Sequence, residues 1–238
     1  MKKLMLIGGG DTGRGNTTYE TKEIDEEVVK MTEKDNPNFL FIGLASSHSD
    51  SYYDTMKKIY KELGCTTVYL KKSNLVNNPD IVKDKISNAD IIYICPGDTV
   101  KLVDHVKEYK LEKLLLDAYN KGTVLVGNSA GAILLTDKGY SDSLIYRNES
   151  DKHEFINGLG FVNLSFCPHY HSNPIKTKEL EEYLSKHDEE VYSLEDKTAL
   201  KIEDDKISII KSDKNAKVYK VSYKDKLIEK EVKWKIEY

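Results

Sequence analysis

The stretch Gly127-Asn128-Ser129-Ala130-Gly131 decides the fold of this chain through the segments that flank it. Residues 123–126 precede it as a short β-branched apolar run, which predicts a buried strand. Residues 132–135 follow it as small and then aliphatic side chains, which suit a helix packed on a sheet. The stretch therefore predicts a strand, a sharp turn with a serine at its corner, and a helix.

A serine at such a corner is typical of a nucleophile elbow. The glycines permit close backbone approach and strained dihedral angles, and the turn lifts the serine hydroxyl above the sheet edge. The helix behind it aims free backbone N–H groups at the same point, where they can stabilise an oxyanion. Chance alone produces this glycine-serine-glycine spacing in roughly one chain in ten of this length, so an incidental serine is the alternative. The strand and the helix on either side favour the catalytic interpretation.

Composition argues against several classes of partner. The chain has 238 residues, of which 39% are hydrophobic and 32% charged, and its net charge of −4 comes from interspersed acids and bases. Such a surface has no basic field for nucleic acid or anionic lipid. We therefore expect no nucleic-acid and no membrane partner. A single domain over residues 1–238 accommodates this length.

The cysteines and the N-terminus indicate a cytoplasmic protein. Cys65, Cys95 and Cys167 are odd in number and widely spaced, which predicts buried free thiols in a reducing compartment. The apolar run at the N-terminus stops at Gly8, short of the core of a signal peptide. No run approaches the length that spans a membrane.

Apolar runs and amphipathic stretches alternate through the first two thirds of the chain. This alternation predicts an α/β fold with a doubly wound, mostly parallel sheet and helices on both faces. Residues 163–168 and 190–194 add two strands to this sheet, with a helix over 174–187 between them. The other expected strands are residues 3–7, 39–45, 67–70, 91–95 and 123–126, and the expected helices include 52–63, 100–109 and 111–120.

The C-terminal part of the chain has a different pattern. Residues 199–203, 207–211, 218–223 and 228–234 predict short strands joined by turns. We expect them to form an antiparallel β-meander extension, over residues 199–238, of the single α/β hydrolytic domain. Residues 139–157 are polar and lack periodicity, which predicts a mobile loop over the site.

Polar residues follow each expected strand at the point where it ends. In a doubly wound sheet the ligand binds at the carboxyl ends of the strands, so these residues should converge on one site. They include a serine, a histidine and carboxylates, which are the parts of a Ser-His-acid triad. The converging residues are Gly8, Gly9, Gly10, Ser46, Ser47, Gly97, Asp98, Ser129, His169, Glu195 and Asp196.

His169 is the expected general base. Pro168 fixes the backbone before it, and a histidine is neutral near working pH, as a base must be. His171 is its competitor, because alternation along an extended segment points both rings the same way and lets His171 line the pocket. The other histidines stand in polar or helical contexts typical of the surface: His48, His105, His153 and His187.

Gly97 and Ala130 are the expected oxyanion donors. The turn Pro96-Gly97-Asp98-Thr99 lies between a strand and a helix, so Asp98 or Thr99 is placed to cap that helix. The N–H of Gly97 would add a second donor to the N–H of Ala130. We expect the substrate-binding residues to include Asp98, His171, Gly9 and Gly10.

The run from Gly8 to Gly13 matches the glycine fingerprint of dinucleotide-binding folds, directly after a strand. Residues 14–18 are polar and suit a loop, whereas that fingerprint needs a helix, and no acid ends a second strand at the required distance. We therefore expect no nucleotide cofactor. A non-catalytic nucleotide-binding module is the alternative, and it would need a helix N-terminus at residues 11–13 to hold phosphate.

Taken together, these residues resemble the aspartyl dipeptidase (peptidase E) and cyanophycinase family of serine peptidases. The resemblance covers most of the chain and implies a fold related to class I glutamine amidotransferase domains. It also implies that Ser129 is the nucleophile, His169 the base, and Asp196, with Glu195 beside it, the acid. It rests on an ordered set of motifs: Ile7-Gly8-Gly9-Gly10, Gly97-Asp98-Thr99, Gly127-Asn128-Ser129-Ala130-Gly131-Ala132, Pro168-His169-Tyr170 and Glu195-Asp196-Lys197-Thr198-Ala199-Leu200.

The chain departs from the family pattern in two places. Pro96 stands where relatives carry a glycine, which stiffens the oxyanion loop but keeps Gly97 as a donor. The dipeptidases place an arginine after the catalytic histidine to pair with a substrate aspartate, whereas this chain offers Lys176 and Lys178 there. A lysine binds a carboxylate as a point charge, whereas an arginine binds it with two parallel hydrogen bonds. Strict aspartyl specificity therefore does not follow from the resemblance. The chain has two arginines, Arg14 and Arg147.

We therefore expect a serine peptidase that hydrolyses small peptides without a metal or an organic cofactor, as a monomer or homodimer. A hydrolase of another ester or amide would use the same elbow chemistry and stays open. The acid is open too, because alternation lets only one of Glu195 and Asp196 face His169. Carboxylates between Ser129 and His169 are the other candidates: Asp142, Glu149 and Asp151.

Overall fold

The buried apolar runs form the centre of the first of two sheets. The computed structural model describes residues 1–233. β1 (Lys3–Ile7), β4 (Ile91–Ile94) and β5 (Val124–Asn128) are buried along their whole length, as parallel strands covered on both faces are. With β2 (Asn38–Gly43) and β3 (Thr66–Lys71) they pair in parallel in the order β1-β5-β4-β2-β3. These five strands were expected from the sequence, and their ends agree to within two residues.

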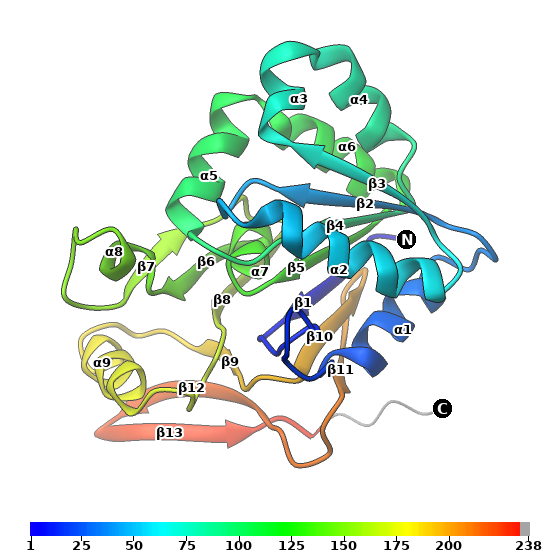
Figure 1. The fold of residues 1–238 in the computed structure, drawn as a ribbon. Coiled ribbons are helices and arrows are strands. Elements are labelled where there is room, and N and C mark those ends of the chain that lie inside the picture. The colour runs from blue at the N-terminus through cyan, green and yellow to red at the C-terminus, as the bar shows by residue number, and fades with distance from the viewer. Residues whose placement is uncertain (234–238) are drawn as a thin grey trace.

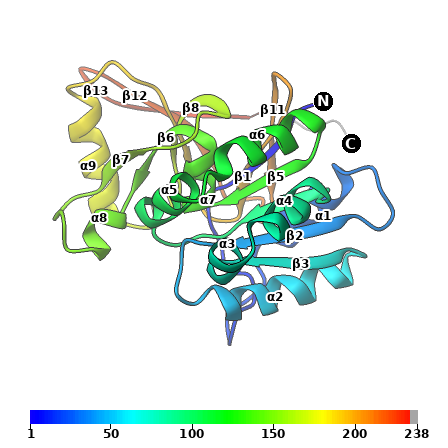
Figure 2. The ribbon, with the colours of Figure 1, turned by 90° about the horizontal axis from the view of Figure 1, so that it is seen from above.

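Helices lie on both sides of this sheet (Figures 1 and 2). The apolar stripe of α2 (Ser49–Glu62) packs toward the sheet through Met56, Ile59 and Tyr60, which are buried. No helix within residues 1–233 is both long and apolar enough to cross a membrane. α1 (Lys22–Lys30) and α2 (Ser49–Glu62) cover one face, and the other face carries α3 (Lys72–Asn77), α4 (Pro79–Ser87), α5 (Thr99–Glu108) and α6 (Leu111–Lys121).

A second sheet begins directly after α7 (Ala130–Leu135). All six residues of this short helix are buried, and it packs against strands of both sheets. Figure 1 shows α8 (Ser143–Tyr146) and α9 (Pro174–Leu184) beside the second sheet. The sheet has the order β13-β12-β9-β8-β6-β7, with β6 (Thr136–Ser141), β7 (Glu154–Asn157), β8 (Val162–Cys167), β9 (Val191–Leu194), β12 (Val218–Lys224) and β13 (Lys226–Glu231).

The expectation that residues 163–168 and 190–194 extend the first sheet is wrong. These residues form β8 and β9, which pair in parallel with each other in the second sheet. The reason is the length of α7, which spans only about 9 Å and cannot carry the chain back along the first sheet as a crossover helix does. The predicted loop over residues 139–157 is wrong as well, because it holds the end of β6 together with α8 and β7.

The expected meander over residues 199–238 is divided between the sheets. β10 (Thr198–Glu203) and β11 (Lys206–Lys211) form an antiparallel pair beside β1 of the first sheet. β12 and β13 form another antiparallel pair, which joins β9 of the second sheet. Between β9 and β10 the chain therefore crosses from one sheet to the other. The end of the predicted strand 228–234 lies outside the described residues.

A carboxyl group is fully buried under the first sheet's covering helices. Asp25 accepts hydrogen bonds from the hydroxyls of Thr21 (2.8 Å), Tyr19 (3.0 Å) and Tyr60 (2.8 Å). Burial raises the pKa of Asp25 to about 6, against the lowering effect of these hydrogen bonds. The folded protein therefore keeps a proton on Asp25 at pH values where the unfolded chain has already lost it.

The substitution Asp25→Asn removes this titration and should change how stability depends on pH. The raised pKa makes the contribution of Asp25 full below pH ~4, and this contribution is lost as the pH rises through about 6. Between these limits the wild type should lose on the order of 3 kcal/mol relative to the variant. Urea unfolding below pH ~4 and above pH about 6 measures how the free energy of unfolding differs between wild type and variant. Asp54→Asn, on the exposed side of α2, is the control. An equal stability gap at both pH values would contradict the prediction.

Candidate active site

Ser129 lies at the corner between β5 and α7. Its backbone has φ 51° and ψ −108°, a strained conformation for a residue with a side chain. Its N–H donates to the carbonyl oxygen of Ile7 at 3.0 Å, which holds the corner against β1. A Cβ on Gly127 or Gly131 would lie 2.3 Å from the carbonyl oxygen of Gly131 or Ile94, so α7 can approach the strands only with glycine at both positions.

His169 and Asp196 meet Ser129 from the second sheet and from the crossing between the sheets. His169 follows β8, and its Nε2 lies 3.0 Å from Ser129 Oγ. Its Nδ1 lies 2.6 Å from Oδ1 of Asp196, which stands between β9 and β10. A proton on Nδ1 donated to the carboxylate leaves Nε2 as the acceptor for the serine hydroxyl. The structure thus brings together the residues expected to be the nucleophile, the base and the acid.

The other predicted acids lie elsewhere. Glu195 Oε1 lies 3.0 Å from Nδ1 of His171, and its Oε2 accepts from the backbone N–H of Lys217. Among the loop carboxylates, Glu149 pairs with Arg147 at 2.8 Å. Asp142 precedes α8 as its N-terminal flanking residue. Within the described contacts of His169, only Asp196 is a carboxylate.

His171, which was expected to line the substrate pocket, contacts two carboxylates of the chain itself. Its Nε2 lies 2.8 Å from Glu229 Oε1, so carboxylates flank both ring nitrogens. The ring of Tyr170 lies beside it, with 4.1 Å between the ring centroids. His171 therefore binds the protein's own carboxylates.

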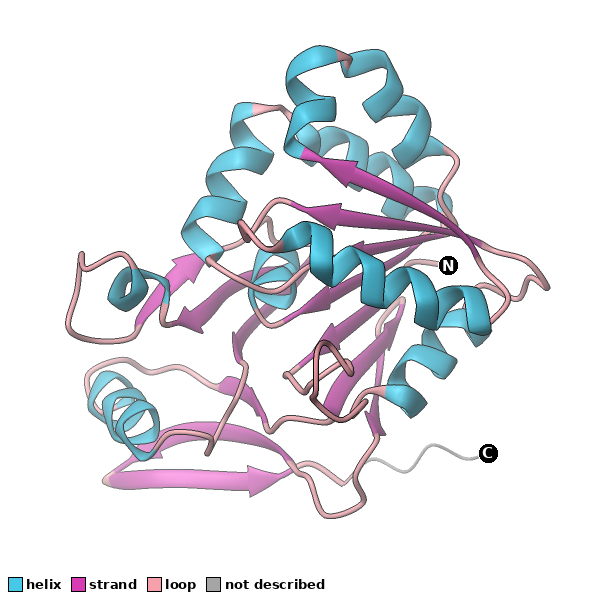
Figure 3. Cartoon of the chain, viewed as in Figure 1, coloured by secondary structure: helices cyan, strands magenta, loops and turns pink. Residues whose placement is uncertain are grey.

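Gly9 makes room for the His169 and Asp196 pair. A Cβ at Gly9 would lie 2.1 Å from Asp196 Oδ1 and 2.4 Å from His169 Nδ1, and the backbone has φ +144°. Gly10 is less crowded, with Thr21 Cγ2 at 3.2 Å from its ideal Cβ. Figure 3 draws the chain after β1 as a loop, and its first helix, α1, begins at Lys22. The helix N-terminus that a nucleotide site would need at residues 11–13 is therefore missing from this described segment.

Gly97 lies where the chain leaves β4, with φ +142° and an ideal Cβ only 2.6 Å from the carbonyl oxygen of Ala45. Within residues 1–233, the backbone N–H groups of Gly97 and Ala130 have no hydrogen-bond acceptor. Asp98 caps α5 by accepting from the N–H of Lys101 at 3.0 Å, as expected for this turn. It also lies 3.7 Å from Arg147.

The buried hydroxyls of Ser141 and Ser143 anchor the Gly97 turn through Thr99, and the sequence did not predict them. Ser143 Oγ accepts from the backbone N–H of Thr99 at 2.6 Å, and Thr99 Oγ1 lies 2.9 Å from Ser141 Oγ. All three residues are buried. The signal was hidden because residues 141–143 lie in the segment that the sequence predicted to be a loop.

A hollow of about 210 Å³ opens beside the Gly97 turn. Arg14 lies over the ring of Tyr52, 5.5 Å from its centroid, and the hydroxyl of Tyr52 accepts from Asn128 Nδ2 at 3.2 Å. Burial raises the pKa of the Cys95 thiol to about 11, so this thiol stays protonated and is no competing nucleophile. Sequence reasoning missed Arg14 at this place. The lining residues are Arg14, Ser46, Ser49, Tyr52, Cys95, Pro96 and Gly97.

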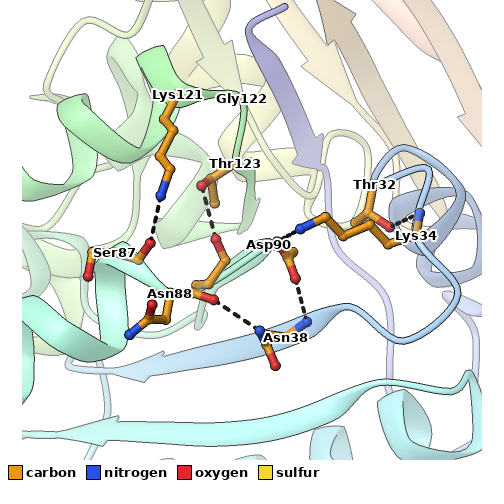
Figure 4. Close-up of a pocket in the computed structure, with 10 residues that line it drawn as sticks. Thr32, Lys34, Asn38, Ser87, Asn88, Asp90, Lys121, Gly122 and Thr123 are labelled. Atoms are coloured by element: carbon orange, nitrogen blue, oxygen red, sulfur yellow. Dashed lines mark hydrogen bonds and ion pairs between the residues drawn. The ribbon is translucent and has the colours of Figure 1, made fainter.

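A second hollow, of about 340 Å³, lies at the opposite, amino ends of the parallel strands (Figure 4). Its polar groups already have partners: Lys34 pairs with Asp90 at 2.6 Å, and Asp90 Oδ2 accepts from the N–H of Asn38. Lys121 Nζ donates to the carbonyl oxygen of Ser87 at 3.2 Å. Strand direction places the catalytic candidates at the other edge, so this hollow is separate from them.

Comparison with known proteins gives a consistent result. The model of Peptidase family S51 matches residues 4–210. The "Uncharacterized peptidase YgaJ" of Bacillus subtilis (strain 168) is 29% identical over 172 residues, 71% of this chain and 69% of its own length. The "Uncharacterized peptidase Lin0382" of Listeria innocua is 27% identical over 139 residues, 57% of this chain and 66% of its own. A peptidase structure from an acI-B1 Actinobacterium shares the fold, with a TM-score of 0.72 and 20% identity over 98% of this chain and 94% of that one.

Gly9→Ala should disable the site while leaving most of the fold intact. The added Cβ would overlap Asp196 Oδ1 and the His169 ring, so these groups must move apart. A displacement of this size should lower kcat/KM for peptide hydrolysis by roughly 100-fold. Gly15→Ala is the matched control, because its φ is also positive (+64°) and nothing lies within 4 Å of its ideal Cβ. Equal activity losses in the two variants would show that backbone strain, and not the overlap, is responsible.

Proposed function

The chain belongs to peptidase family S51 and is a serine peptidase, and on that premise we propose that it hydrolyses small peptides through Ser129, His169 and Asp196. The observation that carries this proposal is the pair of contacts on one imidazole. Nε2 of His169 lies 3.0 Å from Ser129 Oγ, and Nδ1 lies 2.6 Å from Asp196. Both distances are within hydrogen-bond reach for proton transfer.

The proposed reaction passes through an acyl-enzyme. Ser129 Oγ forms a bond to the scissile carbonyl carbon while its proton moves to His169 Nε2. Collapse of the tetrahedral intermediate breaks the C–N bond, and the imidazolium gives that proton to the leaving amine. Water then attacks the ester, again giving a proton to His169, which returns it to Ser129. Asp196 holds the Nδ1 tautomer and stabilises the imidazolium in both halves.

Free backbone donors at the ends of β4 and β5 support oxyanion stabilisation. The N–H of Ala130 directly follows Ser129, and the N–H of Gly97 lies in the turn after β4, the parallel neighbour of β5; neither bonds a backbone carbonyl oxygen in the described structure. Donors that are already in place need no reorganisation when negative charge develops on the carbonyl oxygen. The hydroxyls of Ser141 and Ser143 support this arrangement, because they anchor the turn through Thr99.

The hollow beside Gly97 supports a small substrate with an acidic side chain. Its volume of about 210 Å³ suits one side chain, and Arg14 supplies a cation on its wall. Lys176, one of the lysines expected to stand in for the arginine of the dipeptidases, is buried and donates to the carbonyl oxygen of Pro168 at 2.6 Å. We propose that Arg14 pairs with the acidic side chain of the substrate.

We infer that the first sheet, with helices on both faces, is related to class I glutamine amidotransferase domains. The arrangement of β1 to β5 supports this relation. We also propose that the enzyme works in the cytoplasm as a monomer or homodimer on small peptides, with neither nucleic acid nor a membrane as a partner.

Ser129→Ala should abolish labelling by a fluorophosphonate and reduce peptide hydrolysis by several orders of magnitude. Asp196→Asn should also reduce kcat strongly, because it favours the wrong tautomer of His169. Glu195→Gln is its matched neighbour and should lose much less, since Glu195 contacts His171. Intact-mass spectrometry measures the labelling, and a dipeptide library measures the turnover. Hydrolysis that survives Ser129→Ala would refute the proposal, and labelling without cleavage of any dipeptide would point to another ester or amide.

Arg14→Gln should remove the preference for acidic side chains. The loss of one charge-assisted pair should lower kcat/KM for an acidic dipeptide by roughly 10- to 100-fold, with little change for a neutral one. Arg14→Lys keeps the positive charge but cannot bind a carboxylate with two parallel hydrogen bonds. Its kcat/KM for the acidic dipeptide should fall between those of the wild type and Arg14→Gln. The dipeptide library measures this ratio for each variant. The same drop for neutral and acidic substrates would count against a role of Arg14 in specificity.

A further inference from the structure

The C-terminal hairpin of β12 and β13 lies beyond residues 4–210, which the family model matches, yet it contacts the segment that carries His169. Glu229 on β13 is the contact residue. Its Oε1 accepts from the hydroxyl of Tyr170 at 2.6 Å and lies 2.8 Å from Nε2 of His171. Figure 1 shows the hairpin along the outer edge of the second sheet, where β12 joins β9.

The segment that Glu229 contacts has a strained backbone. His169 and His171 have φ of 52° and 65°, which residues with a side chain seldom adopt. Such conformations persist only where surrounding contacts hold them. Two backbone bonds do so: the N–H of His169 donates to the carbonyl oxygen of Gly8, and the N–H of Tyr170 donates to that of Leu194. The side chains of Tyr170 and His171 add the contacts to Glu229.

The same contacts reach the turn that carries Asp196. His171 lies between Glu229 and Glu195, with Nδ1 at 3.0 Å from Glu195 Oε1. Glu195 immediately precedes Asp196 and accepts from the backbone N–H of Lys217 at the start of the hairpin. The rings of Tyr170 and Tyr219 pack against the His171 ring, with centroids 4.1 and 5.2 Å away. The histidine segment, the aspartate turn and the hairpin are therefore connected through one imidazole.

We propose that Glu229 is a positioning residue of the active site. It fixes Tyr170 and His171, and through them the orientation of His169 relative to Asp196 and Ser129. The C-terminal hairpin is thus part of the machinery that aligns the imidazole. This inference rests on the proposed roles of His169 and Asp196.

Glu229→Ala should lower kcat by roughly 10- to 100-fold through misalignment, with KM little changed. Glu229→Gln keeps an acceptor oxygen and should recover most of the loss. Lys230→Ala is the control, as an exposed neighbour on the same strand, and should behave like the wild type. The combination Tyr170→Phe with His171→Leu removes both donors to Glu229 from the other side, so it should reproduce the loss even if Glu229→Ala loosens the hairpin.

Proton NMR gives a readout that does not depend on turnover. The downfield N–H resonance of the bond between His169 and Asp196, assigned by its loss in Asp196→Asn, should shift or broaden in Glu229→Ala and stay in place in Lys230→Ala. An unchanged resonance or an unchanged kcat in Glu229→Ala would overturn the inference. Hydrolysis that survives Ser129→Ala would instead refute the proposed function and leave the resonance test standing.

Discussion

A backbone hydrogen bond from the N–H of His169 to the carbonyl oxygen of Gly8, at 2.8 Å, joins the two sheets at the site. Gly8 follows β1 of the first sheet, and His169 follows β8 of the second. Ser129 and Thr198 bond to the same short piece of chain, through the carbonyl oxygen of Ile7 and the N–H of Gly8. A Cβ on Gly8 would lie 2.6 Å from Leu194 Cβ, so the sheets can approach this closely only with glycine there. The spacing of Ser129, His169 and Asp196 depends on this junction.

Backbone strain is concentrated around the same junction. Ser129, His169, His171 and Lys197 all have positive φ, between 51° and 67°. Each such residue costs on the order of 1–3 kcal/mol, and the hydrogen bonds across the junction offset this cost. Strain at Ser129 presents the hydroxyl at the corner of the elbow, and strain at His169 turns the imidazole toward it. The buried core of both sheets supplies the rigidity that these conformations require.

Local patterns were sufficient to predict the five parallel strands of the first sheet and to single out Ser129 and His169. Ser129 and His169 each come just after a short strand, where a continuous apolar run bounded by turn residues gives a clear signal. Arg14, Ser143 and Glu229 gave no such signal. Ser143 bonds a residue 44 positions away, and Glu229 bonds one 59 positions away. Contacts at this separation leave no trace in local composition, because either partner alone resembles an ordinary polar surface residue.

The sequence by itself determined the five parallel strands of the first sheet and the position of Ser129 at a corner between a strand and a helix, because apolar runs and glycine placement act over a few residues. Only the tertiary structure decided how those strands divide into two sheets, since α7 is too short to return the chain across the first one. It also decided between the two neighbouring acids. Alternation allows either Glu195 or Asp196 to face His169. The crossing from β9 to β10 directs Asp196 to His169 and Glu195 to His171, because the positions of both sheets set the path of that turn.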